Sequence, residues 1–300
     1  MIPLKKLENG IEMPVLGLGT WLMGGDFEKK PSPQDDIDIR AIRSAIEMGY
    51  THIDTAEIYA AGYSEELVAQ AVKGTARENL FIATKAMRGN HTATLLEQSL
   101  NNSLARLKTD YVDLYYLHQP TPEIPFEETA KGLNRAYRDG KIRHVGVCNF
   151  SKERFDDLQR YLDMPIIANQ VHYNLVFREA EVSGLIDHAQ RNDYFVIAWR
   201  PLRFKKRNAS HSSVETNAWE TGAFPLLDEI AAKYGKTNVQ IALNWTTHKP
   251  NVLTLVKSSN PTHLQDAAGS FDWRLDDADY QKLDRDFKPV FKTSDTIPLI

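Results

Sequence analysis

The sequence predicts an α/β protein folded as one (β/α)8 barrel, or TIM barrel, with an N-terminal β-hairpin cap and an extra C-terminal helix and tail. Eight short apolar runs alternate with longer segments of helical period between residues 15 and 259. Continuous apolar runs are typical of strands buried on both faces, and helical connections force such strands to pair in parallel. Polar residues close successive runs at positions 54, 85, 118 and 149, and these gaps of 31, 33 and 31 residues match an eightfold barrel of about 250 residues.

The predicted elements follow one another without a linker. LKKL and IEM flank Asn9-Gly10, a pair that favours a type I′ hairpin turn. The predicted strands are VLGLGTW, YTHID, NLFIATK, DYVDLYYLH, IRHVGVCNF, PIIANQVHY, YFVIAWRPL and NVLTLVKSS. The predicted helices are DDIDIRAIRSAIEMG, SEELVAQAVKG, TLLEQSLNNSLARLK, FEETAKGLNRAYRDG, KERFDDLQRYL, EVSGLIDHAQRN, PLLDEIAAKYG, TNVQIALNWTTHK and DDADYQKLDRDF. We therefore expect one domain over 1–300, with the hairpin cap in 1–13, the barrel in 14–268 and the C-terminal helix and tail in 269–300.

The composition narrows the class of partner. The chain is 42% hydrophobic and 25% charged, and its net charge of -4 argues against nucleic acid or an anionic membrane as the main partner. Cys148 is the only cysteine, so an intrachain disulfide is excluded and a reducing cytosol is favoured. Since no apolar run approaches the roughly 18 residues of a membrane span, we expect a cytoplasmic protein.

Polar or aromatic residues close most of the predicted strands. In a parallel barrel, all carboxyl ends open onto one rim, where enzymes of this fold place their sites, whereas a doubly wound sheet does not gather them. Each residue alone is more often structural: an aspartate as a helix cap, a lysine at the surface, a histidine in a hydrogen-bonded core. Their placement together at the strand ends favours a functional site at that rim. These residues are Asp54, Lys85, His118, Asn149, Gln170, Trp199 and Lys257.

Four residues form a candidate proton-delivery set. A tyrosine such as Tyr59 titrates near 10 and needs its phenolate stabilised, which the Lys85 ammonium does if Asp54 keeps that ammonium charged. A donor nitrogen on His118 can polarise a carbonyl oxygen as negative charge develops there. The set requires no metal, and it requires a source of hydride.

The segments that hold these residues resemble the aldo-keto reductase superfamily from about residue 4 to about residue 268. They are GLGTW, HIDTAEIY, Lys85, LHQP, GVCNF, NQVHYN, AWRPL and VKSSNPTHL. The resemblance implies a barrel with an extended nicotinamide cofactor across its mouth. It also implies a catalytic tetrad of Asp54, Tyr59, Lys85 and His118, in which Tyr59 protonates the carbonyl while NADPH delivers hydride.

The resemblance also assigns binding residues. Asn149 and Gln170 would bind the carboxamide of the nicotinamide, and Trp199 would stack on the nicotinamide ring. A basic run at 205–207 follows the predicted strand that contains Trp199. The implied cofactor-binding residues are Thr20, Trp21, Asp54, Cys148, Asn149, Gln170, Trp199, Arg200, Pro201, Leu202, Lys257, Ser258, Ser259, His263 and Asp266. The substrate pocket would comprise Trp21, Tyr59, His118 and Gln119.

The phosphate site decides which cofactor is expected. GLGTWLMGG is not a Rossmann fingerprint, because Leu22 stands where G-x-G-x-x-G requires its third glycine. The resemblance places the 2′-phosphate at VKSSNPTHL, where His263 replaces a common arginine and Asp266-Ala267 replaces a common Glu-Asn pair. Histidine is only partly charged at neutral pH. We expect NADPH, with NADH or dual use left open.

The predicted function is NADPH-dependent reduction of an aldehyde or ketone, with a small-molecule carbonyl substrate. One alternative is a non-catalytic, nicotinamide-binding regulatory subunit that senses redox state. Another is a metal-assisted isomerase or lyase on the same barrel, although the sequence lacks ligand spacings such as HExxH. The physiological substrate and the oligomeric state stay open.

Overall fold

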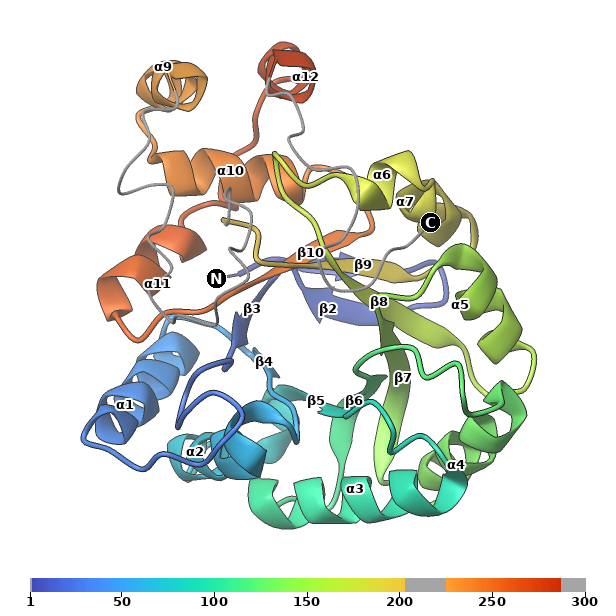
Figure 1. Ribbon diagram of the computed structural model, residues 1–300. Coiled ribbons are helices and arrows are strands. Elements are labelled where there is room, and N and C mark those ends of the chain that lie inside the picture. The colour runs from blue at the N-terminus through green and yellow to red at the C-terminus, as the bar shows by residue number, and fades with distance from the viewer. Residues whose placement is uncertain (1, 203–224, 287–300) are drawn as a thin grey trace.

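The computed structural model of the protein describes residues 2–202 and 225–286 (Figure 1). Eight parallel strands form a closed barrel in the order β10-β3-β4-β5-β6-β7-β8-β9. The predicted (β/α)8 barrel is thereby confirmed, and the doubly wound sheet is wrong. The strands are β3 (Leu16–Gly19), β4 (His52–Asp54), β5 (Phe81–Ala86), β6 (Val112–Leu117), β7 (Ile142–Cys148), β8 (Ile166–His172), β9 (Phe195–Trp199) and β10 (Val252–Val256).

The described residues form α-helices, most of which cover the outside of the barrel, and successive helices in the first half of the chain pack on one another (Figure 1). They are α1 (Gln34–Glu47), α2 (Tyr63–Ala71), α3 (Ala93–Leu107), α4 (Phe126–Arg138), α5 (Lys152–Gln159), α6 (Glu179–Val182), α7 (Leu185–Arg191), α9 (Pro225–Tyr234), α10 (Asn238–Thr246), α11 (Pro261–Ala268) and α12 (Asp277–Asp286). EVSGLIDHAQRN, predicted as one helix, is two: Gly184 has a φ of 71° and divides α6 from α7. A left-handed residue cannot continue a right-handed helix.

The N-terminal hairpin pairs β1 (Leu4–Lys6) with β2 (Glu12–Pro14) in antiparallel register. Its turn differs from the predicted type I′ geometry, because Gly10 has a φ of 92° but Asn9 has no positive φ. A type I′ turn needs positive φ at both central residues. The backbone N–H groups of Glu8 and Asn9 instead donate to the Asp193 carboxylate, at 2.7 and 2.9 Å. The loop is therefore shaped by its docking against the segment before β9.

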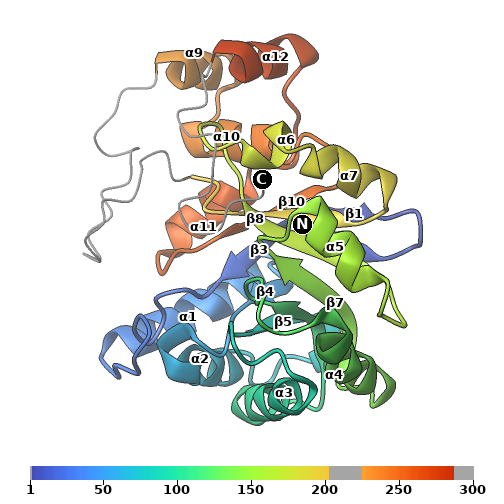
Figure 2. The same cartoon turned by 45° about the vertical axis from the view of Figure 1, so that its right-hand side comes forward.

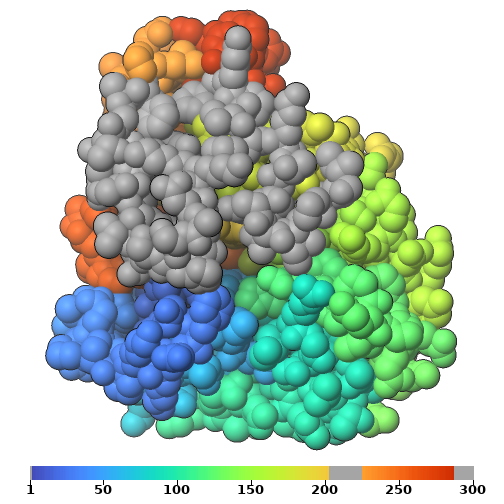
Figure 3. Space-filling view, viewed as in Figure 1, coloured from blue at the N-terminus to red at the C-terminus, as the bar shows by residue number. Residues whose placement is uncertain are grey.

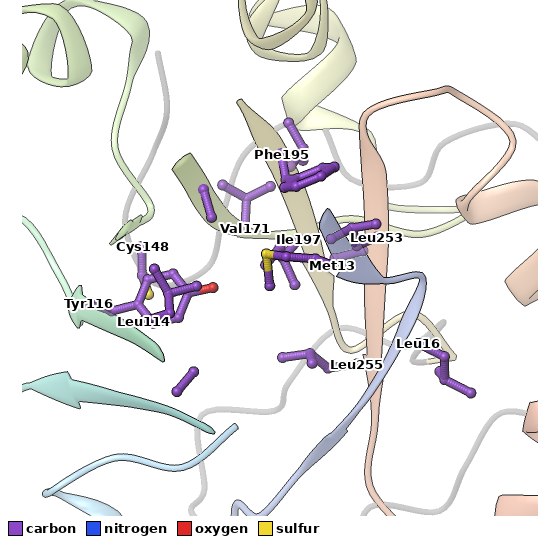
Figure 4. Close-up of a cluster of buried hydrophobic side chains, with 14 of the residues drawn as sticks. Met13, Leu16, Leu114, Tyr116, Cys148, Val171, Phe195, Ile197, Leu253 and Leu255 are labelled. Carbon is purple, nitrogen blue, oxygen red and sulfur yellow. The ribbon is translucent and has the colours of Figure 1, made fainter. Parts of the chain in front are cut away.

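The barrel interior is packed with side chains rather than open (Figure 4). Met13, from the hairpin, is fully buried and belongs to the same core as Ile197 and Leu253 (Figure 4). Tyr116 on β6 occupies the space that Gly146 leaves on β7, since a Cβ at position 146 would lie 2.5 Å from the Tyr116 ring. Such a core fixes the strands, and hence the positions at which their carboxyl ends present polar side chains.

The chain adds two helices outside the ring of the barrel. Helices α9 and α12 pack on each other beyond α10 (Figure 2). In the space-filling view they stand at the top, while the blue to green first half of the chain forms a continuous surface below (Figure 3). The predicted C-terminal helix is thus confirmed. The predicted loop at 203–222 with Lys205, Lys206 and Arg207, and the tail at 287–300, lie outside the described residues.

Across the two described ranges, no helix has both the length and the apolar character that crossing a membrane demands.

Candidate active site

The four predicted catalytic side chains meet at the carboxyl ends of β4, β5 and β6, which are neighbours in the barrel. The Lys85 ammonium donates hydrogen bonds to Asp54 Oδ1 at 2.5 Å and to the Thr55 carbonyl at 2.7 Å. It also donates to Tyr59 Oη at 3.4 Å. The Tyr59 ring lies 5.6 Å from the His118 ring, between centroids, with an interplanar angle of 73°. A phenol, an ammonium and an imidazole therefore share one mouth.

The charges at this site favour a protonated tyrosine beside a charged lysine. Burial lowers the pKa of Lys85, but the Asp54 carboxylate and Tyr59 raise it more, so the net pKa lies above its usual value. Burial raises the pKa of Tyr59 to about 12, although Lys85 pulls it downward. The sequence predicted that Lys85 tunes Tyr59, and the direction of that effect holds. In the described structure, however, burial raises the pKa of Tyr59 more than Lys85 lowers it, so Tyr59 stays a neutral acid at physiological pH.

The backbone around Tyr59 adopts a strained turn. A 3₁₀ segment, Tyr59–Gly62, contains two left-handed alanines, Ala60 with a φ of 50° and Ala61 with a φ of 53°. Such conformations cost of order 1 kcal/mol for a residue with a Cβ and concentrate at functional sites. The Ala60 N–H donates to the Asp26 carbonyl at 2.7 Å, which ties this turn to the loop after β3. This contact helps to fix the turn that carries Tyr59 beside Lys85.

His118 is held as a neutral imidazole. Burial lowers its pKa well below the usual value, and the positive charge of Lys85 and the neighbouring His91 lower it further. Its backbone N–H donates to the Ala86 carbonyl at 2.9 Å. Behind it, His91 is 2% exposed and its Nδ1 lies 2.9 Å from Thr121 Oγ1. A neutral imidazole keeps one N–H, which is the donor that a developing oxyanion needs.

Gln170 joins the tetrad through Asp54. Its Nε2 donates to Asp54 Oδ2 at 2.9 Å, so the two carboxylate oxygens bind Lys85 and Gln170 separately. Thr20, which the resemblance places at the ribose, is fully buried and bonds the Asp54 carbonyl through its Oγ1 at 3.2 Å. Both residues support Asp54 in the described structure. Their expected contacts with a cofactor stay predictions.

The loop after β3 supplies an aromatic wall on the other side of Tyr59. The Trp21 ring lies 4.9 Å from the Tyr59 ring in an edge contact. Phe27, which the sequence did not single out, lies 5.2 Å from Trp21 and is 49% exposed. Gln119 follows His118 and is half-buried. These side chains give the predicted substrate pocket one apolar wall and one polar residue.

The predicted carboxamide-binding residues lie on the strands next to the tetrad. Asn149 follows β7 with a φ of 58° and donates its backbone N–H to the Gln170 carbonyl on β8. Cys148 is buried, and burial raises the pKa of its thiol, so it stays protonated. These three residues are contiguous across β7 and β8, which suits one planar amide of a ligand.

The predicted nicotinamide platform closes β9. Trp199 stacks on His172 of β8, with centroids 4.6 Å apart and an interplanar angle of 18°. The Arg200 guanidinium lies 4.8 Å from the centroid of the Trp199 ring, and Arg200 has a φ of 54°. Pro201 is buried and Leu202 is half-buried. Trp199 is thus fixed at the rim by His172 and Arg200, and its stacking on a nicotinamide stays a prediction.

The predicted phosphate site follows β10. The Lys257 ammonium donates to Ser259 Oγ at 3.4 Å, and Ser258 Oγ accepts from the Asn260 N–H at 3.0 Å. Asn260 caps α11 through its side chain and satisfies the Thr262 N–H at 2.9 Å. One lysine and two hydroxyl groups therefore gather beside a helix N-terminus, a combination that suits an anion.

His263 and Asp266, the two other residues predicted at the phosphate site, differ in their surroundings. His263 is exposed on the first turn of α11, where it is free to meet a phosphate. Asp266 instead accepts from Thr237 Oγ1, at 2.9 Å to Oδ1 and 3.2 Å to Oδ2, and so contacts the residue that caps α10. The part of Asp266 in cofactor binding stays a prediction.

A nicotinamide dinucleotide suits this arrangement of residues. The amides, the aromatic ring and the cationic site close β7, β8, β9 and β10, which are consecutive in the barrel. An extended ligand with an amide at one end and a phosphate at the other requires such a continuous arc. Within residues 2–202 and 225–286, no three His, Cys, Asp or Glu side chains gather in a way that could ligate a metal ion.

Several structural features of the site have no signal in the sequence. Five non-glycine residues at the mouth have positive φ, namely Leu22, Ala60, Ala61, Asn149 and Arg200. Glu57 accepts from the Met87 N–H at 2.7 Å and joins the loops after β4 and β5. These features depend on contacts between distant segments, so periodicity and spacing do not reveal them. Only the proximity of Glu57 to Tyr59 in HIDTAEIY could have indicated its position.

Comparisons with known proteins agree with this geometry. The model of the "Aldo/keto reductase family" matches residues 15–286. The aldo-keto reductase YhdN of Bacillus subtilis is 32% identical, over 92% of this chain and 90% of its own, and the methylglyoxal reductase YeaE of Escherichia coli is 31% identical, over 96% of each. A solved aldo-keto reductase from Klebsiella pneumoniae in complex with NADPH is 32% identical, with a TM-score of 0.82 over 96% of this chain and 98% of that chain. With its barrel, its four converging side chains and these relatives, the chain belongs to the aldo/keto reductase family of oxidoreductases.

Proposed function

We propose that this protein is a cytoplasmic, NADPH-dependent carbonyl reductase that converts small aldehydes or ketones to alcohols. The observation that carries the proposal is the placement of one ammonium, that of Lys85, between the Asp54 carboxylate and the Tyr59 hydroxyl. This arrangement stabilises a phenolate that forms only when Tyr59 gives up its proton. Stabilisation limited to the transition state raises the rate rather than the affinity.

The residues of the site divide the chemistry among them. His118, as a neutral imidazole, donates a hydrogen bond to the carbonyl oxygen of the substrate and polarises it. The proton that this oxygen takes comes from Tyr59 Oη, and Lys85 stabilises the phenolate that remains. Asp54 holds Lys85 charged and in place. Bound NADPH supplies the hydride that reduces the carbonyl carbon.

The proposed cofactor contacts follow the arc from β7 to β10. Asn149 and Gln170 would bind the carboxamide, and the ring of Trp199 would support the nicotinamide. Lys257 and the neighbouring hydroxyl groups would meet the 2′-phosphate. Support comes from their order along the rim and from the related Klebsiella pneumoniae structure, which is described as a complex with NADPH.

The proposed substrates are small carbonyl compounds such as methylglyoxal. The support is the name of a relative, the methylglyoxal reductase YeaE, together with the surroundings of Tyr59. The ring of Trp21 contacts the ring of Tyr59, and Gln119 follows His118 in the chain and is half-buried. A compact carbonyl with a polar neighbour fits between an aromatic ring and an amide.

Tyr59→Phe tests this proposal. The variant keeps the ring and loses only the proton donor, so we expect methylglyoxal-dependent NADPH oxidation to fall by at least about 100-fold, with NADPH affinity within a few-fold. Tyr63→Phe is the matched control, because its hydroxyl bonds Asp35 away from the tetrad. Equal losses of turnover and NADPH binding in Tyr59→Phe would show a structural role. Tight NADPH binding without turnover by the wild-type protein would support a regulatory subunit instead.

A further inference from the structure

A buried carboxylate lies against the predicted phosphate site. Asp38, on α1, is 1% exposed, although it is 221 residues from Ser259 in the chain. Its Oδ1 accepts from Ser259 Oγ at 2.5 Å and from Gln34 Nε2 at 3.0 Å. Among the described residues, none of the Lys, Arg or His side chains forms an ion pair with it within 4.0 Å. Burying an aspartate without a paired cation is costly, so its position needs an explanation.

Asp38 is linked through Ser259 to Lys257, the cation of the predicted phosphate site. Lys257 donates to Ser259 Oγ at 3.4 Å, and that hydroxyl in turn donates to Asp38. The hydroxyl is therefore oriented toward the carboxylate. The negative charge of Asp38 also acts on Lys257, whose pKa burial lowers and Asp38 raises. Lys257 and Ser259 thus already interact with the carboxylate of Asp38. A bound 2′-phosphate would need the same ammonium and the same hydroxyl.

The chemistry of Asp38 distinguishes the two nicotinamide cofactors. A 2′-phosphate carries negative charge and is repelled by a nearby carboxylate, whereas a ribose 2′-hydroxyl is neutral and is not. The repulsion is only weakly screened because the carboxylate is buried. Position 263 on the first turn of α11 carries a histidine, which lacks the permanent charge and the bidentate donors of an arginine. The site therefore has less net positive charge than a phosphate pocket built from lysine and arginine alone.

We propose that Asp38 determines cofactor specificity: its buried carboxylate, bonded to Ser259 beside Lys257, weakens the preference for NADPH and lets the enzyme use NADH as well. The inference rests on the proposed function and on the cofactor site at Lys257 and Ser259. It assigns to α1 a part in recognising the adenosine end of the cofactor.

Binding of NADP⁺ and NAD⁺, measured by calorimetry on the full chain, tests the inference without turnover. We expect wild-type protein to bind NADP⁺ no more than about tenfold tighter than NAD⁺. Asp38→Asn removes the charge and keeps the shape, and should tighten NADP⁺ by about tenfold while leaving NAD⁺ within twofold. Asp36→Asn is the control, because it removes the same charge from an exposed position of the same helix. It should change neither affinity.

The outcomes separate the inference from the proposed function. If wild-type protein binds both dinucleotides but Asp38→Asn leaves their ratio unchanged, or shifts it no more than Asp36→Asn does, the specificity role of Asp38 is wrong and the reductase proposal stands. A wild-type preference for NADP⁺ of more than about 1,000-fold would also overturn the role, without any variant. Failure of the wild-type protein to bind either dinucleotide would overturn both proposals.

Discussion

Gln170 donates a 2.9 Å hydrogen bond to Asp54, across a separation of 116 residues. The bond joins β8 to β4 across the barrel and occupies the carboxylate oxygen that Lys85 leaves available. Asp54 is thereby fixed by one partner on each oxygen. Gln170 is thus in a position to act on the tetrad as well as on a cofactor.

Gln170→Leu separates these two roles. Loss of the bond frees one oxygen of Asp54, so if Gln170 mainly positions Asp54, kcat falls by about 10-fold and NADPH affinity stays within a few-fold. If Gln170 mainly binds the carboxamide, the Kd for NADPH rises by a similar factor and kcat at saturation changes little. Single-turnover rates and fluorescence titration of NADPH measure the two quantities. A variant with both quantities unchanged would remove Gln170 from the site.

The pH profile follows from the raised pKa of Tyr59. Reduction needs Tyr59 protonated, and burial raises its pKa to about 12, so kcat/KM for reduction should stay level from about pH 6 to about pH 10. Oxidation of the alcohol needs the phenolate, so its kcat/KM should rise with pH over the same range. A reduction rate that halves near pH 8 would contradict this assignment. Lys85 lowers the pKa of Tyr59, so Lys85→Met should raise that pKa. Alcohol oxidation, which needs the phenolate, should then be slower than in the wild-type protein at the same pH.

Gly146→Ala should destabilise the barrel. The added Cβ would lie 2.5 Å from the ring of Tyr116, and a packed core cannot absorb that overlap, so we expect a loss of about 1–3 kcal/mol in the free energy of unfolding. Gly19→Ala is the matched strand control, since its Cβ would meet nothing closer than the Val256 carbonyl at 3.8 Å. Urea unfolding measures both. Adding Tyr116→Leu to Gly146→Ala should recover part of the loss, and an unchanged midpoint in Gly146→Ala would contradict the packing argument.

Phe27→Ala should alter the range of substrates. The ring of Phe27 extends the wall formed by Trp21, so a bulky carbonyl such as phenylglyoxal should lose about 3- to 10-fold in kcat/KM, while methylglyoxal, which is too short to reach it, changes little. Tyr161→Ala is the control, because Tyr161 is 48% exposed but lies beyond α5. Equal losses for both substrates would indicate that Phe27 only supports the loop.

The sequence predicted the barrel and the residues of the tetrad, because both depend on local patterns. Apolar runs and helical periods are set by neighbours along the chain, and the parallel closure then brings strand ends to one rim. The same reasoning did not find the break at Gly184 or the turn at Asn9. At the turn the sequence allows more than one conformation, and the hydrogen bonds to Asp193 select one.

What the sequence determined by itself is the kind of site: an acidic, a basic, a phenolic and an imidazole side chain at the ends of successive strands. Only the tertiary structure decided their partners. The bonds of Gln170 to Asp54 and of Ser259 to Asp38, and the left-handed turn beside Tyr59, depend on barrel closure and strand register. A hydrogen bond extends over about 3 Å, so register and closure, which no local segment encodes, select which of many polar side chains can meet.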